Sequence, residues 1–362
     1  MLRKTCALLA LILMSAVASG CAAASPGDKA GGPGAGPVVL RMASAPYALG
    51  DSATVGEFVR MVGALSRGAL KVAVISQWGD YSPDAETQVV RAVAAGTVDL
   101  GWAGSRVFDS MGVPDFRALS APMLIDSYPL ENAVLHSAMP GRMLAGLASV
   151  HVTGLGVLGE GLRLPIGVQR PLLAPADWHG VSFGTTHSGI QEQAIRALGA
   201  TPVVAIGPYR DHGLDSGQIQ AFELDVQRYA RMGLAARAPY VTANVVLWPQ
   251  FDVLVANPAR LASFTTQQRA WLRQAADAAV RDSVKLAASQ NGSVRQACTM
   301  GARFVHATPA DLAALRSSLS AVYQALQQDP RTSVFIHQIQ RLKDSTQAGP
   351  APAAPAGCTR KP

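Results

Sequence analysis

A glycine-rich stretch in the middle of the chain is one place where this sequence could do chemistry. Residues 154–159 read GLGVLG and satisfy the GxGxxG pattern, which binds a dinucleotide pyrophosphate when a helix begins within the glycines. The next residues, EGLRLP at 160–165, contain a glycine and a proline that disfavour such a helix. The motif therefore predicts close packing of a strand where the chain passes between two lobes, and we expect no cofactor.

A second motif, GVSFG at 180–184, fits the GxSxG elbow of serine hydrolases and would make Ser182 a nucleophile. Such an elbow ends a strand and opens a helix, whereas this motif lies inside a short predicted strand that follows a turn. The chain also shows no recognisable acid and histidine in the expected order. A lipid-anchored serine hydrolase using Ser182 is therefore the less favoured interpretation. We expect a binding protein with no catalytic residues.

The four cysteines divide between the N-terminus and the rest of the chain. Cys6 lies within a predicted export signal and Cys21 at its end, which leaves Cys298 and Cys358 in an oxidising compartment, where they can pair as a disulfide. No CxxC pair occurs, and the histidines do not cluster at the spacing of metal ligands. We therefore predict no metal site.

The first twenty-one residues have the pattern of a lipoprotein signal peptide. Arg3 and Lys4 precede an apolar run over 7–18 that falls short of the ~20 residues of a membrane-spanning helix, and small residues lead to Cys21. Residues 1–20 are predicted to be removed and Cys21 to carry lipid. The protein is then expected outside the cytoplasm, anchored in the periplasm or on the outer face of the cytoplasmic membrane. The alternative is an uncleaved anchor helix.

Composition narrows the class of partner. Loss of Arg3 and Lys4 lowers the formal charge from +7 to +5, and the remaining basic residues are scattered among acidic ones without a block of like charge. This pattern does not favour a nucleic-acid groove. Hydrophobic residues make up 49% of the chain, which is enough for a core.

Strand and helix patterns alternate along the chain and predict two α/β lobes with a cleft between them. The predicted strands cover residues 38–42, 69–75, 98–102, 151–158, 181–185, 202–206, 219–224 and 251–255. The predicted helices cover 53–66, 84–95, 130–148, 189–198, 209–214, a very long stretch after 263–265, 310–327 and 333–343. Residues 21–37 are rich in Ala, Gly, Pro and Ser and predict a flexible tether, and the Ala/Pro-rich residues 346–362 predict a disordered tail.

Five short segments, in order, resemble the DctP-type family of extracytoplasmic solute receptors of TRAP transporters. AGTVDLG at 95–101 is similar to the family's "G-t-i-D-m" strand, and FRALSAPML at 116–124 is similar to its stretch ending in Pro-Phe-Leu. PADWHG at 175–180 resembles the "s-x-x-D-l-k-G" entry to the second lobe, and ALGATP at 197–202 resembles "a-l-G-A-x-p". Residues 254–269 resemble the start of the family's long helix. The similarity spans most of residues 38–345.

The resemblance implies a type II periplasmic-binding-protein fold, with two α/β lobes around a ligand cleft and a long C-terminal helix. Lobe 1 is expected over 38–160 and lobe 2 over 161–260, with the long helix and C-terminal helices over 261–345 packing across both. A receptor of this kind closes on a small polar or carboxylate-bearing solute by a hinge motion. It then delivers the solute to TRAP permease subunits that are powered by an ion gradient, and a monomer is expected.

Four expected ligand-site positions come from this resemblance. A family arginine that grips a carboxylate by two parallel hydrogen bonds falls at Gly184, so the usual clamp is lost at that position. A second family arginine has its counterpart in Arg163, which we expect to contact the ligand. Tyr209 stands in the family's "E-v-y" segment, and Glu223 is retained after a segment in which the family's "D-G" is replaced.

Three more candidates come from their positions next to predicted strands. Arg106 follows the strand that contains Trp102, at the edge where open α/β sheets bind ligands, and could replace the missing positive charge. The competing interpretation is a surface arginine paired with Asp109. Trp102 and Tyr47 could form aromatic walls of the cleft, or belong to the core.

A second functional class fits the same fold. An extracytoplasmic ligand sensor would bind its solute in the same cleft but dock on a signalling protein instead of a permease. Permease genes beside the coding gene would favour transport, and a sensor-kinase gene would favour signalling.

Overall fold

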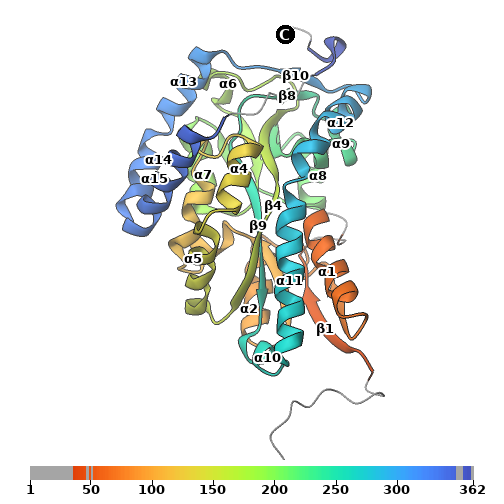
Figure 1. Cartoon of the computed structure of the whole chain (residues 1–362). Coiled ribbons are helices and arrows are strands. Elements are labelled where there is room, and N and C mark those ends of the chain that lie inside the picture. The colour runs from red at the N-terminus through yellow and green to blue at the C-terminus, as the bar shows by residue number, and fades with distance from the viewer. Residues whose placement is uncertain (1–35, 46–48, 50–51, 348–353, 360–362) are drawn as a thin grey trace, which may run out of the picture. The chain divides into compact units, whose positions relative to one another are not determined.

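A computed structural model describes residues 36–45, 49, 52–347 and 354–359. The predicted signal peptide, Cys21 and Tyr47 lie outside these residues. Within the described part, strands and helices alternate along most of the chain, and the strands form one ten-stranded sheet flanked by helices (Figure 1). Eight strands follow each other in the order β2-β1-β3-β9-β4-β7-β5-β6, while β8 and β10 form a side branch.

The bounds of the elements agree with most of the predicted segments. The strands are β1 (Val38–Ala43), β2 (Leu70–Ile75), β3 (Leu100–Gly104), β4 (Thr153–Gly167), β5 (Ser182–Thr185), β6 (Thr201–Val204), β7 (Ala221–Leu224), β8 (Tyr240–Thr242), β9 (Trp248–Ala256) and β10 (Arg303–Val305). The α-helices are α1 (Ala53–Leu65), α2 (Ala85–Ala94), α3 (Val107–Ser110), α4 (Tyr128–Leu135), α5 (Met139–Gly146), α6 (Pro175–Trp178), α7 (Gly189–Ala197), α8 (Pro208–Asp215), α9 (Val226–Arg231), α10 (Pro258–Ala262), α11 (Thr266–Ser283), α12 (Leu286–Thr299), α13 (Pro309–Ser318), α14 (Ser320–Gln328) and α15 (Pro330–Ser345).

The first half of the sheet is built around β1. This strand pairs in parallel with β2 and with β3, and Leu40 of β1 lies opposite Val72 of β2. Parallel neighbours require a crossover, and α1 and α2 follow β1 and β2 in the chain to supply it. Helix α1 buries Val55, Phe58 and Val62, which share one helical face. The strand–helix–strand beginning predicted from the sequence is confirmed.

The second half of the sheet contains β5, β6 and β7. Strand β5 pairs in parallel with β6 and β7, and β7 pairs antiparallel with residues 164–167 of β4. The end of β4 also pairs with β8, which in turn pairs with β10. Strand β4 is therefore shared by both halves.

Strand β9 joins the first half although it follows the second half in sequence. It lies antiparallel between β3 and β4, and Leu254 sits opposite Trp102. All nine residues of β9 are buried. The expected range 161–260 for lobe 2 therefore includes a strand that pairs within the first half of the sheet.

Strand β4 is much longer than predicted. The sequence predicted a strand over 151–158 followed by breakers, but the strand continues through the glycines and Pro165 to Gly167. Two register shifts against β9, at Gly154/Gly156 and at Gly159/Gly161, absorb the irregular backbone, and Gly161 has a φ of +112° that other residues rarely adopt. No helix starts within the glycines, so the dinucleotide pattern has no phosphate-binding geometry here.

Three predicted helices are divided in the structure. The segment 130–148 forms α4 and α5, the segment 310–327 forms α13 and α14, and the very long helix forms α11 and α12. Helix α11 begins with a capping box in which Thr265 and Gln268 exchange hydrogen bonds, as expected from the threonine before the periodic run. Periodicity identified the helical segments but not the breaks, because each pair continues the same sequence pattern.

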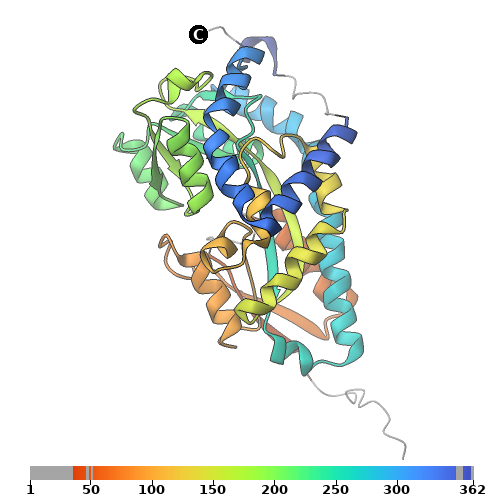
Figure 2. The ribbon, with the colours of Figure 1, turned by 90° about the vertical axis from the view of Figure 1, so that its left-hand side faces the viewer.

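Helices contact one another across long distances in the sequence. Helix α11 lies against α1 and against β4, and both contacts can be followed beside the central strands in Figure 1. Helices α13 to α15, in dark blue, lie near α4 in Figure 2, and α15 contacts α4. The C-terminal helices thus pack on elements of the N-terminal half of the chain.

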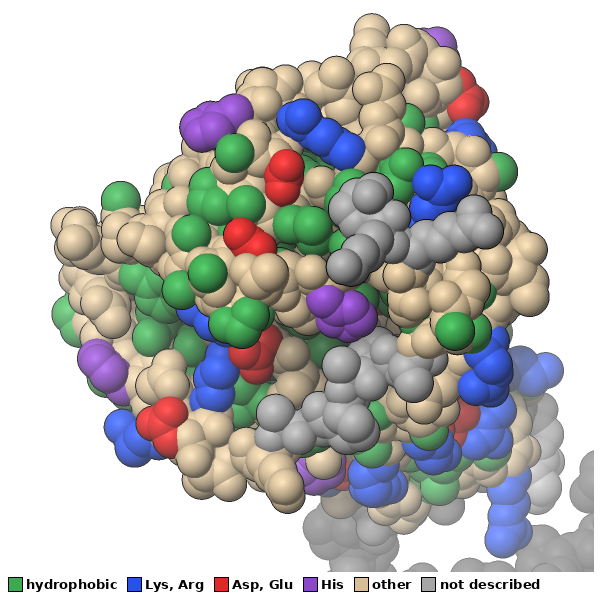
Figure 3. Space-filling view, turned by 90° about the horizontal axis from the view of Figure 1, so that it is seen from above, with side chains coloured by type: hydrophobic (Ala, Val, Ile, Leu, Met, Phe, Trp, Pro, Cys, Tyr) green, Lys and Arg blue, Asp and Glu red, His purple; other side chains and the backbone are tan. Residues whose placement is uncertain are grey.

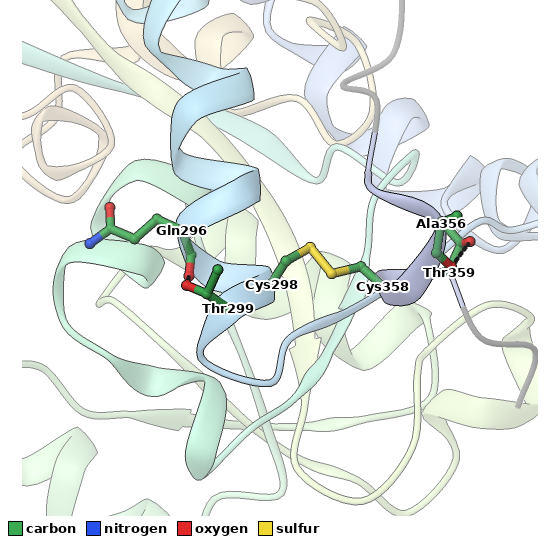
Figure 4. The surroundings of a disulfide bond; sticks show 6 residues. All are labelled: Gln296, Cys298, Thr299, Ala356, Cys358 and Thr359. Carbon is green, nitrogen blue, oxygen red and sulfur yellow. Dashed lines mark hydrogen bonds between the residues drawn. A yellow bond between two sulfur atoms is a disulfide. The ribbon is translucent and has the colours of Figure 1, made fainter.

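A disulfide joins Cys298 of α12 to Cys358, the last residue of a short 3-10 turn over Ala356–Cys358 (Figure 4). The Cys358 side chain is buried in the apolar cluster around Phe222 and Phe304. Residues 354–359 are therefore ordered, and the prediction of disorder over 346–362 is wrong for them. Composition alone favoured disorder, because Ala and Pro bury little, whereas the disulfide expected between Cys298 and Cys358 holds the segment on the core.

The described surface carries both signs of charge. Basic, acidic and hydrophobic side chains all appear on the face seen from above (Figure 3). Across the described ranges, we find no helix with the length and apolar character required to cross a membrane.

Candidate functional site

A cavity of about 210 Å³ lies where the two halves of the sheet meet. The first half contributes residues near the ends of β3 and β9, and the second half contributes residues of β5, β7, α8 and α9. Its charged lining residues are Glu86, Arg106, Arg163, Arg210, Glu223, Arg228, Arg231 and Asp252. Arginine thus dominates the polar surface of the cavity.

Two arginines converge on one oxygen in the wall of this cavity. Gln250 Oε1 accepts a hydrogen bond from Arg106 Nη1 at 3.4 Å and from Arg163 Nη2 at 3.3 Å. Gln250 Nε2 donates to Asp252 Oδ1 at 2.7 Å, which fixes the orientation of the amide. The pair therefore presents hydrogen-bond donors from two guanidinium groups to the same place, an arrangement suited to a carboxylate.

Arg106 is buried, and its ion-pair partner is Glu86 of α2. Glu86 Oε1 also accepts the backbone N–H of Gly104 at 2.7 Å, so β3 and α2 hold the carboxylate together. Asp109 pairs with Arg117 instead. The interpretation of Arg106 as a surface arginine paired with Asp109 is therefore wrong, because the side chain folds back over Gly104 into the cavity wall.

Arg163 faces Glu223 across the junction of β4 and β7. Arg163 Nε lies 3.5 Å from Glu223 Oε2, and Thr185 Oγ1 donates to Glu223 Oε1 at 3.4 Å. Burial lowers the pKa of the Arg163 guanidinium, against the opposing effect of Glu223. Burial also raises the pKa of Glu223, against the opposing effects of Arg163 and Arg106. The contact is loose, and neither Arg163 Nε nor Glu223 Oε2 has a hydrogen-bond partner among the described residues.

Gly184 lines the cavity, but the space beside it is filled by apolar side chains. A Cβ atom at this position would lie 3.1 Å from Ile219 Cγ2 and 3.1 Å from Phe222 Cβ. These contacts are tighter than ordinary van der Waals distance. The absence of a side chain at 184 is therefore matched by close packing of Ile219 and Phe222.

The aromatic candidates have different outcomes. Trp102 lines the cavity and also packs in the core cluster of the first half, so both interpretations apply to it. Its indole Nε1 has no hydrogen-bond partner in the described part of the chain. Tyr209 is 59% exposed and does not line this cavity, and Tyr47 lies outside the described residues.

A second cavity of about 420 Å³ adjoins the first and includes Tyr209 in its lining. Tyr81 and Ile206 line both cavities and so lie between them. The Tyr81 ring packs against Gly207, where an added Cβ would lie 2.8 Å from the ring. Tyr81 follows β2 and Gly207 follows β6, so this contact links the two halves of the sheet beside the cavity.

A group of buried acids lies next to the cavity. Glu160, in the irregular part of β4, accepts hydrogen bonds from Ser52 Oγ at 2.5 Å and from Thr54, and it pairs with Arg228 of α9 at 2.9 Å. Burial, reinforced by Glu160, raises the pKa of Asp252 to about 7. One carboxylate therefore links the start of α1 with α9 on the other half of the sheet.

Several cavity residues were missed from the sequence. Glu86 lies in the first turn of a predicted helix, and Arg228 and Arg231 are three residues apart after Asp225, the N-cap of α9. That spacing places both arginines on one helical face and was a usable signal. Gln250 gave no signal, because only the pairing of β9 with β4 brings it beside Arg163.

Neither metal nor serine chemistry is indicated. Among the residues that the structure describes, no three His, Cys, Asp or Glu side chains gather where they could hold a metal ion. Ser182 is the first residue of β5, and the helix α7 begins only after residue 188. The GxSxG residues therefore do not form the strand-to-helix elbow that a hydrolase requires.

The two halves of the α/β sheet share crossing strands, and an arginine-lined cavity lies between them. This arrangement is typical of the solute-binding proteins. The chain belongs to the bacterial extracellular solute-binding proteins of family 7, the DctP family, whose model matches residues 50–329. This is a family of receptors for transport and not of enzymes.

Known relatives agree with this assignment. The C4-dicarboxylate-binding periplasmic protein DctP of Rhodobacter capsulatus is 24% identical over 167 residues, which are 46% of this chain and 49% of that protein. The match thus spans about half the length of this relative.

Solved structures confirm the type II periplasmic-binding-protein fold. A TRAP periplasmic solute-binding protein of Ralstonia eutropha H16 with bound (S)-2-acetolactate has a TM-score of 0.76 at 18% identity, covering 85% of this chain and 99% of its own. The sugar-acid-binding protein DctPAm of Advenella mimigardefordensis, in complex with galactonate, has a TM-score of 0.74 at 16% identity, covering 85% and 99%.

Proposed function

We propose that this protein is the extracytoplasmic receptor of a TRAP-type importer and binds a small organic acid in the cavity between the two halves of the sheet. One observation carries the proposal: Arg106 and Arg163 reach the same acceptor oxygen from different elements. A ligand carboxylate that replaced the weaker amide contact would receive charge-assisted hydrogen bonds from both. Relatives of the same fold carry galactonate and acetolactate, which are acids of this kind.

Contacts from both halves of the sheet would couple binding to closure. Arg106 follows β3 in the first half, whereas Arg163 faces Glu223 of β7 in the second. A ligand that engages both arginines stabilises the arrangement in which the halves meet. The lobe ranges 38–160 and 161–260, with 261–345 packing across them, remain part of this proposal.

The binding proposal is tested by calorimetry on protein that has been unfolded and refolded to remove carried-over ligand. Galactonate, glucuronate, acetolactate and short-chain acids are titrated beside neutral analogues of equal size. We expect only the acids to bind, and Arg163→Gln and Arg106→Gln each to weaken binding about tenfold or more, the effect of one charge-assisted hydrogen bond.

Arg237→Gln is the matched control, because Arg237 pairs with Asp215 on the surface away from the cavity. Preserved affinity in both Arg163→Gln and Arg106→Gln would refute the site. Binding of neutral solutes alone would refute the ligand class.

The membrane anchor is the other part of the proposal. Cys21 would carry the lipid after removal of residues 1–20, and the tether that follows would let the receptor reach TRAP permease subunits. Labelled palmitate should enter the native protein and not Cys21→Ala. Equal labelling of the two proteins would exclude this anchor.

A further inference from the structure

We propose that the solute bound in this cavity is an amino acid, whose carboxylate is held by the arginine pair Arg106 and Arg163 and whose ammonium group is held by two acids of the cavity wall. These acids are Glu223 of β7 and Asp252 of β9. The inference rests on the proposed function and specifies its ligand as a zwitterion.

The acids of the cavity wall differ in how fully they are bonded within the chain. Among the described residues, Glu86, Glu223 and Asp252 are the acids that line the cavity. Glu86 uses both oxygens, because Oε1 accepts the backbone N–H of Gly104 and Oε2 pairs with Arg106. In contrast, Glu223 Oε2 and Asp252 Oδ2 have no hydrogen-bond partner in the described part of the chain. A buried acceptor without a partner costs free energy, which a donor group of the ligand would recover.

Glu223 lies directly beside the arginine pair. Its Oε2 is 3.5 Å from Arg163 Nε, and its Oε1 accepts a hydrogen bond from Thr185 at 3.4 Å. An ammonium group next to Oε2 would form a shorter, charge-assisted hydrogen bond. Because this oxygen is so close to Arg163, the two charged groups of the ligand must also be close together. This condition favours α- and β-amino acids over amino acids with a more distant ammonium group.

Asp252 is connected to the arginine pair through Gln250. These two are the polar side chains of β9, a strand whose nine residues are all buried, and their spacing places them on the same face. Gln250 Nε2 donates to Asp252 Oδ1, while Gln250 Oε1 accepts from both arginines. One amide side chain therefore separates this acid from the place where the ligand carboxylate would bind.

The electrostatics of these two acids favour a cationic group over a hydroxyl group. Burial, reinforced by Glu160, raises the pKa of Asp252 to about 7, and burial raises the pKa of Glu223 against the effects of Arg163 and Arg106. The positive charges already in the cavity thus do not offset the burial of these carboxylates. An ammonium group would stabilise their ionised forms, whereas a hydroxyl group would supply a hydrogen bond without a charge.

Calorimetry with sets of acids that share a carbon chain tests this inference on protein that has been unfolded and refolded. Both enantiomers of alanine are compared with lactate and propionate, and those of 2-aminobutyrate with 2-hydroxybutyrate and butyrate. β-Alanine is compared with 3-hydroxypropionate. For the native protein we expect at least one amino acid to bind about tenfold or more tightly than the matching hydroxy acid, the effect of one charge-assisted hydrogen bond.

Two variants remove the negative charges with little change in shape. Glu223→Gln can still accept from Thr185, and Asp252→Asn can still accept from Gln250, so neither melting temperature should fall. Each should reduce the preference for the amino acid over the hydroxy acid about tenfold. Glu223→Gln should also bind propionate and butyrate more tightly, because no acid then competes for Arg163. The variants are read independently, so that loss of folding in one leaves the other as the test.

Asp215→Asn is the matched control, because Asp215 pairs with Arg237 and does not line the cavity. It should leave the preference for the amino acid unchanged.

Failure of this inference is distinguishable from failure of the proposed function. Hydroxy acids that bind the native protein as tightly as the amino acids, absence of binding by every amino acid, or an unchanged preference in the folded variants would overturn the zwitterion. Binding of propionate, butyrate or the hydroxy acids would then still leave a carboxylate receptor. Binding of neutral solutes alone would overturn the proposed function itself.

Discussion

Replacement of Glu131 by Gln should change how the stability of this protein depends on pH. Glu131 lies on α4, is 3% exposed, and its Oε1 has no hydrogen-bond partner among the described residues. The acids that face it are Glu160 of β4 and Asp225 before α9. Burial, reinforced by these two acids, raises the pKa of Glu131 from 4.5 to about 8.

The direction of this pH dependence follows from proton binding to Glu131 in the folded and unfolded states. Between about pH 4.5 and pH 8, folded Glu131 keeps a proton that the unfolded chain has released, so its contribution to stability is greatest at low pH and is lost as the pH rises. Each pH unit in this window lowers the free energy of unfolding by about 1.4 kcal/mol. From pH 6 to pH 8 the free energy of unfolding falls by about 2 kcal/mol. The fall is less than the full slope would give, because at pH 8 about half of the folded molecules still carry the proton on Glu131.

Thermal unfolding of ligand-free protein at pH 6 and pH 8 measures this effect. A loss of about 2 kcal/mol corresponds to a fall of roughly 3 °C in melting temperature for a chain of this size. Glu131→Gln should remove that fall, so the variant gains stability relative to the native protein mainly at pH 8. Asp252, which also has a raised pKa, is present in both proteins and does not affect the difference.

Asp344→Asn provides the control, because Asp344 is exposed on α15 and, among the described residues, accepts a hydrogen bond only from Gln340. Parallel pH profiles for the native protein and Glu131→Gln would refute the reasoning. They would mean that Glu131 is charged in the folded state at neutral pH.

Three other substitutions test separate features. Gly207→Ala should weaken ligand binding about tenfold, because the φ of 53° and ψ of −128° suit glycine and the new Cβ would meet the Tyr81 ring. Gly217→Ala is the control and should leave binding unchanged, because the space around Gly217 is open. Trp102→Phe should weaken binding about fivefold by removing an indole N–H of the cavity wall that has no hydrogen-bond partner among the described residues. Cys358→Ser should lower the free energy of unfolding by up to about 4 kcal/mol, since the disulfide joins residues with a sequence separation of 60. It should leave the affinity for the ligand unchanged.

Each of these has a contradicting outcome. Equal affinity in Gly207→Ala and Gly217→Ala would show that the contact with Tyr81 does not help the halves meet. Unchanged binding by Trp102→Phe would assign this tryptophan to the core alone. Two reactive thiols in the unreduced native protein would contradict the disulfide.

Most elements of this fold could be predicted because their information is local. Short runs of apolar residues marked β1 and β2, a 3.6-residue period marked α1, and Thr265 marked the start of α11. The length of β4 could not be predicted this way. Its glycines and Pro165 read as breakers, and only pairing with β9, β7 and β8 keeps the chain extended through them.

In the candidate site, too, some residues could be identified from the sequence, whereas their partners could not. Arg163 and Gly184 were identified from the resemblance, and Arg106 from its place after a strand. Their partners Glu86, Glu223 and Gln250 are far away in the chain, and strand pairing and helix packing alone bring them together.

By itself, the sequence determined the family, the alternating α/β elements and the predicted export signal, because these depend on residue types at short spacing. Only the tertiary structure decided that Arg106 turns inward to Glu86, that Ile219 and Phe222 fill the space beside Gly184, and that α8 and α9 add three arginines to the cavity. The physical reason is that charge pairing and packing depend on which surfaces meet, and here those surfaces come from segments that lie between 20 and 144 residues apart.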